Sequence, residues 1–147
     1  MISQTTEYAL RAIVFLAQSA TSAKTAVAIA EGAGIPVGYL SKIMQGLAKA
    51  GLVRSQRGPS GGFTLVDAPR DLSVYAVVHA IDPIERITAC PVGDLGHGTN
   101  LCPLHRALDN TILAVETAFR KLSIQGLIDR PQTRRPLCAF PCHAPAK

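Results

Sequence analysis

Two short helical segments joined by a glycine-containing turn are the feature that most constrains the fold of this 147-residue chain. Residues 24–34 form the first segment, with Thr25 as a candidate N-cap and Gly34 as a helix breaker. The second segment runs from Pro36 to about Ala50 and is followed by Gly51. Its apolar residues recur at helical spacing: Leu40, Ile43, Met44, Leu47 and Ala48. Such a pair is typical of a helix-turn-helix.

The other face of the second segment carries small or hydrogen-bonding side chains. These residues are Val37, Gly38, Tyr39, Ser41, Lys42 and Gln45. A face of this kind suits entry into the major groove of DNA, where base edges are read by hydrogen bonds. An ordinary solvated helix face would show the same residue types, so both interpretations stay open here.

A glycine-rich hairpin follows the helix pair directly. Residues 52–55 and 62–66 are expected to form two short strands, and 56–61 their connection. A helix-turn-helix followed by such a hairpin is a winged helix. Glycines at the tip allow close approach to a phosphate backbone, and Arg57 supplies positive charge, although arginine is common in loops.

The charge distribution agrees with a nucleic-acid partner for the first half of the chain. Residues 1–70 hold 7 basic and 3 acidic residues, whereas 71–147 hold 8 and 7. Lys42, Arg54 and Arg57 are the candidates for phosphate attraction. No run approaches the roughly 20 apolar residues of a membrane span, and no secretory signal is found, so a cytoplasmic protein is expected.

A long helix is expected from 104 to about 124, because its apolar residues advance by three or four positions. The stripe consists of Leu104, Leu108, Ile112, Val115, Phe119 and Leu122. A core of roughly 80 residues cannot easily cover a protruding helix of this length, so we expect a homodimer. The residues from Leu108 to Leu122 in this stripe would form its interface. Folding back onto the same chain is the alternative.

The expected fold class is therefore mainly α with a small β-hairpin wing: a winged helix-turn-helix plus a long C-terminal dimerisation helix. We divide the chain into a DNA-binding domain (1–81), a cysteine and histidine loop (82–103), the dimerisation helix (104–128) and an irregular tail (129–147). The tail contains Cys138, Cys142 and His143, which we interpret as incidental rather than as a second metal site or a thiol switch.

The loop before the long helix concentrates potential metal ligands. They are Cys90, His97, Cys102 and His105. Cys102 and His105 are three positions apart at the start of a helix, so they project from one face. Three interpretations compete: unligated thiols and imidazoles, a tetrahedral zinc site, or an iron–sulfur cluster. Ligand type does not separate the last two.

The sequence resembles the IscR/NsrR family of bacterial winged-helix regulators. The resemblance covers about residues 1–125 and is carried by the motifs at 6–12, 35–43 and 51–63, together with the order of the elements. It implies a dimeric transcriptional regulator that reads the major groove with Tyr39 and its neighbours. It also implies that the wing residues reach the adjacent minor groove: Arg57, Pro59, Ser60 and Gly61. A redox- or nitric-oxide-sensitive iron–sulfur cluster is the third implication.

The cysteine loop departs from the family pattern of three cysteines. Cys90 and Cys102 match the outer two and His105 matches the histidine of some members, while the middle position falls near Gly96. The fourth ligand would then be His97, or Glu7 of the partner subunit, because some members recruit an acidic residue of the first helix in this way. We therefore predict a homodimeric repressor with a [2Fe–2S] cluster and a palindromic operator in double-stranded DNA. The alternative is a cluster-free or zinc-stabilised regulator with a thiol switch.

An enzyme is the rival from another class, for example a small metallohydrolase built on the same loop. It would need an open coordination position, a general base and a substrate pocket. A winged helix in the first half leaves little chain for such a pocket. We therefore expect neither an enzymatic activity nor a small-molecule substrate.

Overall fold

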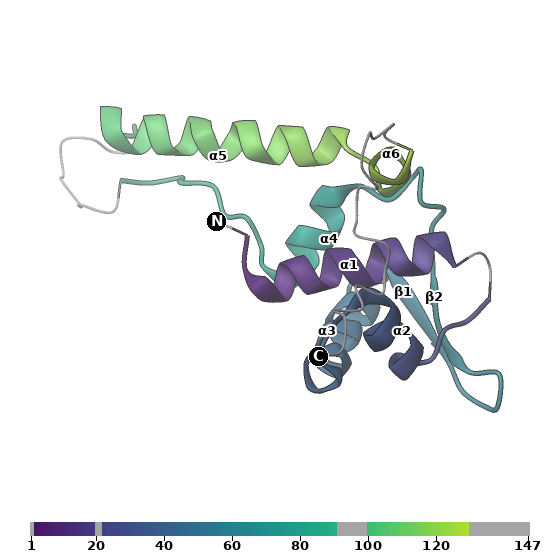
Figure 1. Cartoon of the computed structure of the whole chain (residues 1–147). Coiled ribbons are helices and arrows are strands. Elements are labelled where there is room, and N and C mark those ends of the chain that lie inside the picture. The colour runs from purple at the N-terminus through teal and green to yellow at the C-terminus, as the bar shows by residue number, and fades with distance from the viewer. Residues whose placement is uncertain (1, 20–21, 91–99, 130–147) are drawn as a thin grey trace, which may run out of the picture.

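The computed structural model describes residues 2–19, 22–90 and 100–129 (Figure 1). The chain is mainly helical with one two-stranded antiparallel sheet. Its elements are α1 (Gln4–Gln18), α2 (Ala26–Ala33), α3 (Val37–Lys49), β1 (Val53–Gln56), β2 (Gly62–Leu65), α4 (Val74–Ile81), α5 (Pro103–Lys121) and α6 (Ile124–Ile128). Across these ranges, no helix has the length and apolar character that crossing a bilayer requires.

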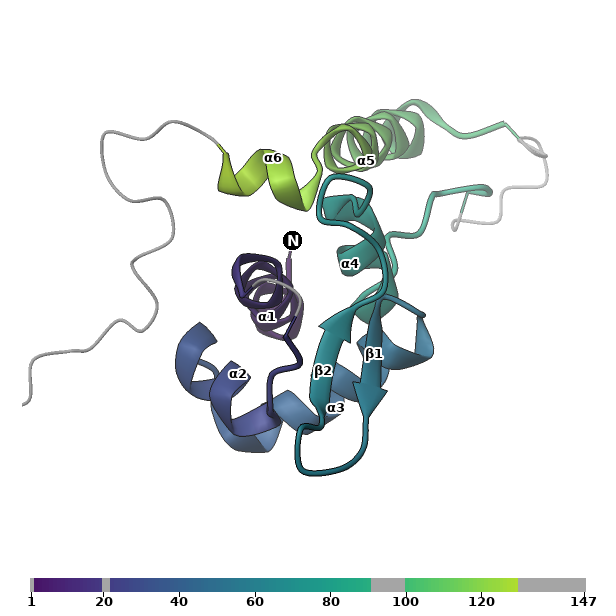
Figure 2. The same cartoon turned by 90° about the vertical axis from the view of Figure 1, so that its right-hand side faces the viewer.

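The core is built around α1, which packs against α2, α3, α4 and α6 (Figure 2). Ser3 caps α1 by accepting a hydrogen bond from the backbone N–H of Thr6. Ala9, Ala12 and Ile13 of α1 are fully buried, and Leu40 and Leu47 of α3 are equally inaccessible. The apolar face predicted for α3 therefore points into this core, as its spacing requires.

The predicted helix-turn-helix is confirmed with its expected caps. Thr25 accepts a hydrogen bond from the backbone N–H of Ala28 and begins α2. Gly34 ends α2 in the left-handed region, with φ +62°. A side chain there would be strained, and its Cβ would also lie 2.7 Å from Nη2 of Arg11.

The predicted hairpin is also confirmed, with Val53 opposite Leu65 and Gln56 opposite Gly62. An unpredicted backbone bridge extends it, because Lys24 and Phe63 exchange hydrogen bonds of 3.0 and 2.8 Å. A Cβ at Gly62 would lie 2.4 Å from the carbonyl oxygen of Lys24. The glycine thus permits the close approach that ties the wing to the segment before α2.

The expectation of one helix reaching residue 124 is wrong. α5 ends at Lys121, since Leu122 takes an extended backbone (φ −99°, ψ 111°) and Ser123 caps a separate helix, α6. Val74 N–H donates to the Leu122 carbonyl and Ile124 N–H donates to that of Leu72, each at 2.8 Å. Ile124 is fully buried, so α6 belongs to the same core as α1–α4.

Candidate nucleic-acid interface and metal centre

α3 presents the polar face that the sequence predicts. Val37 and Tyr39 are each 57% exposed. The other candidates on this helix are also exposed: Gly38, Ser41, Lys42 and Gln45. The structure thus leaves free the face that would enter a major groove.

Contacts from α1 hold the start of α3 and the turn before it. Nη2 of Arg11 donates a hydrogen bond of 3.0 Å to the carbonyl oxygen of Gly34. The ring of Tyr8 meets that of Tyr39 edge-on, with centroids 6.1 Å apart. Arg11 also lies 3.8 Å from the carboxylate of Glu7. The position of the turn therefore depends on residues of α1.

The wing places basic and small residues on the same side of the molecule as α3, opposite α5 (Figures 1 and 2). Arg54, Arg57, Pro59 and Ser60 are exposed, and Gly61 is half-buried. A Cβ at Gly61 would lie 2.6 Å from the carbonyl oxygen of Gln56. Gly61 is therefore required by the tight tip itself, whatever the tip touches.

Cys90, Cys102 and His105 form a compact group at the start of α5. Cys102 is the N-cap residue, Pro103 follows at the first helical position and His105 lies in the first turn. Nδ1 of His105 is 3.1 Å from Sγ of Cys102 and 3.4 Å from Sγ of Cys90. All three potential ligand atoms lie within 4.8 Å of one another, and all three residues are half-buried.

His105 also changes the chemistry of the neighbouring thiol. Interaction with its backbone N–H, and then with its imidazole, lowers the pKa of Cys102 from 9.0 to about 7. A helix N-terminus has the same effect, because its unpaired N–H groups favour negative charge. Cys102 is therefore substantially ionised at neutral pH, which suits both metal ligation and thiol chemistry.

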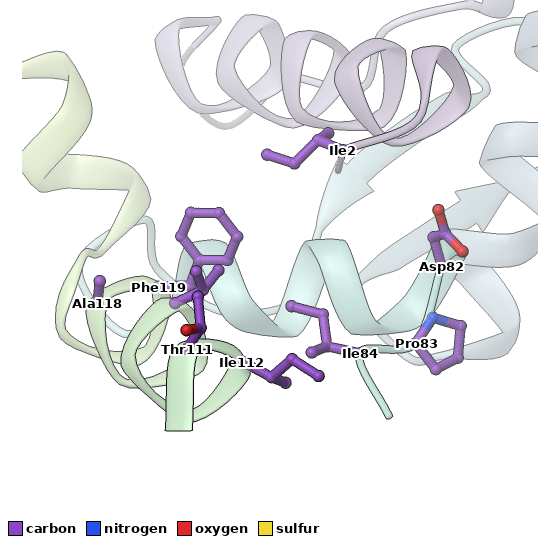
Figure 3. Close-up of a pocket in the computed structure, with 9 residues that line it drawn as sticks. Ile2, Asp82, Pro83, Ile84, Thr111, Ile112, Ala118 and Phe119 are labelled. Atoms are coloured by element: carbon purple, nitrogen blue, oxygen red, sulfur yellow. The ribbon is translucent and has the colours of Figure 1, made fainter. Parts of the chain in front are cut away.

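Much of the predicted apolar stripe on α5 is exposed. Leu104, Leu108 and Val115 are 63%, 47% and 41% exposed. Ile112 and Phe119 face inward and line a groove of about 640 Å³ between α5, the start of α1 and residues 82–84 (Figure 3). The remaining lining residues are Ile2, Asp82, Pro83, Ile84, Thr111, Val115 and Ala118.

Comparison with known proteins decides the family. Residues 2–130 match the model of the Rrf2 family, described as iron-dependent transcriptional regulators. The chain belongs to the Rrf2 family. An Rrf2-like helix-turn-helix regulator of Rhodobacter capsulatus is 44% identical over 86 residues, which span 56% of this chain and 57% of that relative. This Rrf2 protein is a transcriptional regulator and not an enzyme.

Solved structures agree on the fold of this Rrf2 protein. CymR of B. subtilis, described as the global cysteine regulator, has a TM-score of 0.73 at 19% identity, covering 90% of this chain and 98% of its own. IscR of T. potens has a TM-score of 0.70 at 22% identity, covering 90% and 88%. The winged-helix architecture expected from the sequence is thus confirmed.

The two candidates for a fourth ligand are placed differently in the Rrf2 protein. Glu7 lies on α1, with its side chain 63% exposed and paired with Arg11. Within the described residues of one chain, it is not part of the group that Cys90, Cys102 and His105 form. His97 lies outside the described residues, as do Cys138, Cys142 and His143.

One feature next to the metal-ligand group was missed by sequence reasoning. Arg86 donates two hydrogen bonds to Asp109, of 2.7 and 2.6 Å, and the backbone N–H of Ile87 donates a third of 3.0 Å. The Arg86 guanidinium lowers the pKa of the Asp109 carboxyl. The only sequence feature that could have indicated this contact was the position of Asp109, one helical turn after His105.

Proposed function

We propose that this Rrf2 regulator is a homodimeric repressor that acts in the cytoplasm and changes its affinity for a palindromic operator with the state of a [2Fe–2S] cluster. The observation that carries the proposal is the grouping of Cys90, Cys102 and His105 within 4.8 Å, in a family described as iron-dependent. Thiolates and imidazole are established ligands of such clusters.

DNA binding would use α3 and the wing together. The exposed side chains of Tyr39, Ser41, Lys42 and Gln45 would meet base edges in the major groove. Gly38 would permit close approach at the start of α3, and the exposed Val37 would make an apolar contact in the groove. The wing tip with Arg57, Pro59, Ser60 and Gly61 would reach the adjacent minor groove, and Arg54 would contact phosphate.

The donor set at α5 fits an iron–sulfur cluster with mixed ligands. Cys90, Cys102 and His105 would hold it, and either His97 or Glu7 of the partner subunit would complete the set. When bound, the cluster supplies one-electron redox chemistry, and a histidine ligand raises its potential relative to cysteine alone. His105 lies in the first turn of α5. A change in its ligation to the cluster would therefore move the helix that forms the dimer interface in this proposal.

The partner that covers α5 in this proposal is a second copy of the chain. Leu108, Ile112, Val115, Phe119 and Leu122 would contribute to its interface, and the groove beside α5 would receive apolar side chains of the other subunit. An exposed apolar stripe of this kind on a monomer marks an interaction surface. Two-fold symmetry then implies two half-sites in the operator.

A zinc-bound or thiol-switching regulator is the second candidate, favoured by the compactness of the group. Ligands of one tetrahedral zinc ion lie ~3.8 Å apart when the Zn–S bonds are ~2.3 Å. Sγ of Cys102 and Sγ of Cys90 lie 3.1 and 3.4 Å from Nδ1 of His105, so the three donor atoms are close enough to share one ion. Cys90, Cys102 and His105 would then hold one zinc ion, which would tie Cys90 to α5 without supplying redox chemistry.

Metal and acid-labile sulfide analysis of anaerobically purified protein separates the candidates. We expect about two irons and two sulfides per chain. Stoichiometric zinc without sulfide, or no metal, would overturn the cluster and support the second candidate.

The regulatory step is tested by fluorescence anisotropy at fixed salt, with an operator selected from random duplexes. Oxidised, reduced and metal-free protein should differ in affinity, and equal affinities would contradict sensing. Lys42→Ala should reduce the slope of affinity against salt by about one. Lys121→Ala removes a charge from the far end of α5 and is the control.

A further inference from the structure

Cys90 reaches the metal-ligand group on a segment that has no regular structure of its own. α4 ends at Ile81, and residues 82–90 form neither helix nor strand. Cys102 and His105, in contrast, are fixed by α5. The position of Cys90 therefore depends on whatever attaches residues 82–90 to that helix.

Asp109 makes this attachment. Its Oδ1 accepts from Nε of Arg86 at 2.7 Å and from the backbone N–H of Ile87 at 3.0 Å, and its Oδ2 accepts from Nη2 of Arg86 at 2.6 Å. Among the described residues, no other hydrogen bond joins 82–89 to α5. The paired geometry with arginine restricts both position and orientation.

The surroundings favour a well-defined contact over a loose surface pair. The Asp109 side chain is only 13% exposed and that of Arg86 is 35% exposed. Asp109 follows His105 by one helical turn, so both side chains project from the same face of α5. Cys90 is three positions after Ile87, a distance of at most ~10 Å along an extended chain. The contact thus confines Cys90 to a small volume beside His105.

We propose that Asp109 is a positioning residue that holds the Cys90 thiol within reach of Cys102 and His105. This role deepens the proposed function and rests on the Cys/His group being the sensing site. Without the Asp109 contact, residues 82–90 would sample more conformations, and the local concentration of the Cys90 thiol near Cys102 would fall.

The local concentration can be measured without any metal. Metal-free full-length protein carrying Cys138→Ser and Cys142→Ser is equilibrated with glutathione. The two protein thiols and one glutathione disulfide give the Cys90–Cys102 disulfide and two glutathione thiols. We expect Asp109→Ala to lower the equilibrium constant about tenfold or more. Alanine is a good helix former, so α5 itself is not weakened.

Glu116→Ala is the matched control. It removes another carboxylate and ion pair from the inner face of the same helix, since Glu116 pairs with Arg120 at 2.7 Å. Its equilibrium constant should stay within about twofold of the parent. Arg86→Ala removes the two hydrogen bonds that the guanidinium donates, at the more exposed side of the contact. It should also lower the equilibrium constant, and it serves as the test variant if Asp109→Ala fails to fold.

The possible outcomes separate this role from the proposed function. An unchanged equilibrium in Asp109→Ala or Arg86→Ala, or an equal loss in Glu116→Ala, would overturn the positioning role. Neither result depends on whether the wild-type protein holds iron and sulfide. Conversely, absence of iron and sulfide would overturn the cluster, while the thiol equilibrium would still test Asp109.

Discussion

The two halves of the molecule are held together in different ways. α1 buries six residues in its 15, and α3 and α4 each bury several more. α5 has 19 residues and buries none. The first half is stabilised by apolar packing, whereas α5 and residues 82–90 meet through Asp109, the Cys/His group and a few half-buried apolar side chains.

This difference separates the part of the molecule whose apolar side chains are mostly buried from the part whose apolar side chains are mostly exposed. The winged-helix elements and Ile124 of α6 enclose one cluster of buried apolar side chains. In a single chain the apolar stripe of α5 stays exposed at Leu108 and Val115, and the Cys/His group is linked by hydrogen bonds among its own members. A second subunit would cover the first and a metal or a disulfide would link the cysteines of the second, which is the arrangement expected of a part that responds to a signal.

The largest expected effect tests the packing of the core. Leu47 is fully buried, so Leu47→Ala should lower the free energy of unfolding by about 2–5 kcal/mol. Leu113 on α5 is 42% exposed, and Leu113→Ala should cost about 0.5 kcal/mol or less. Urea unfolding followed by circular dichroism measures both. Equal losses would show that α5 is as well packed as the core and would remove the contrast.

A smaller effect is expected at the exposed stripe. Leu108→Asp places a charge in the proposed dimer interface and should raise the dimer dissociation constant about thirtyfold or more. Sedimentation velocity over a range of concentrations measures this. Asn110→Asp adds the same charge on another face of α5 and should leave the dimer intact. If Leu108→Asp protein dimerises as tightly as the wild type, the stripe is not the interface.

The smallest effect concerns the Cys/His group. The pKa of Cys102 is lowered to about 7 by His105, below the ordinary 9.0. Thiolate reactivity should therefore persist above pH 7 and fall as the pH drops through 7. At pH 7, His105→Ala should slow alkylation of Cys102 by iodoacetamide in metal-free protein about fivefold.

His79→Ala provides the comparison for this measurement, because it removes an exposed histidine from α4. Mass spectrometry of the Cys102 peptide gives the rate at each pH. A pH profile that is the same with and without the His105 side chain would show that the imidazole does not act on the thiol.

Sequence reasoning located the winged helix well because its signals are local. Thr25 caps the helix that it was expected to cap, and glycines end or connect the neighbouring elements. The break after Lys121 was missed because Leu122 continues the apolar period of α5. Tertiary pairing with residues 72–74 decides that break, although Ser123 was an available capping signal.

The candidate site was only partly accessible from the sequence. Cys90, Cys102 and His105 could be proposed from residue type and family resemblance, and the structure brings them together. The contact between Arg86 and Asp109 spans 23 positions and depends on how residues 82–90 lie along α5. No local pattern encodes such a pairing. The stripe on α5 also looked uniform in sequence, while its residues differ in exposure: Leu108 and Val115 are exposed, and Ile112 and Phe119 are half-buried.

The two backbone hydrogen bonds that flank Ser73 and Ser123 attach α5 to the core at one end, so the helix can act as a lever arm. The C-terminal end of α5 is attached to the core through Ile124. The cysteines lie at its N-terminal end, about 28 Å away at 1.5 Å per residue. A displacement of about 2.5 Å at the tip corresponds to a rotation of only about 5° at the fulcrum for an arm of this length. A small change in the position of the cysteines would therefore rotate α5 by only a few degrees where it joins the core.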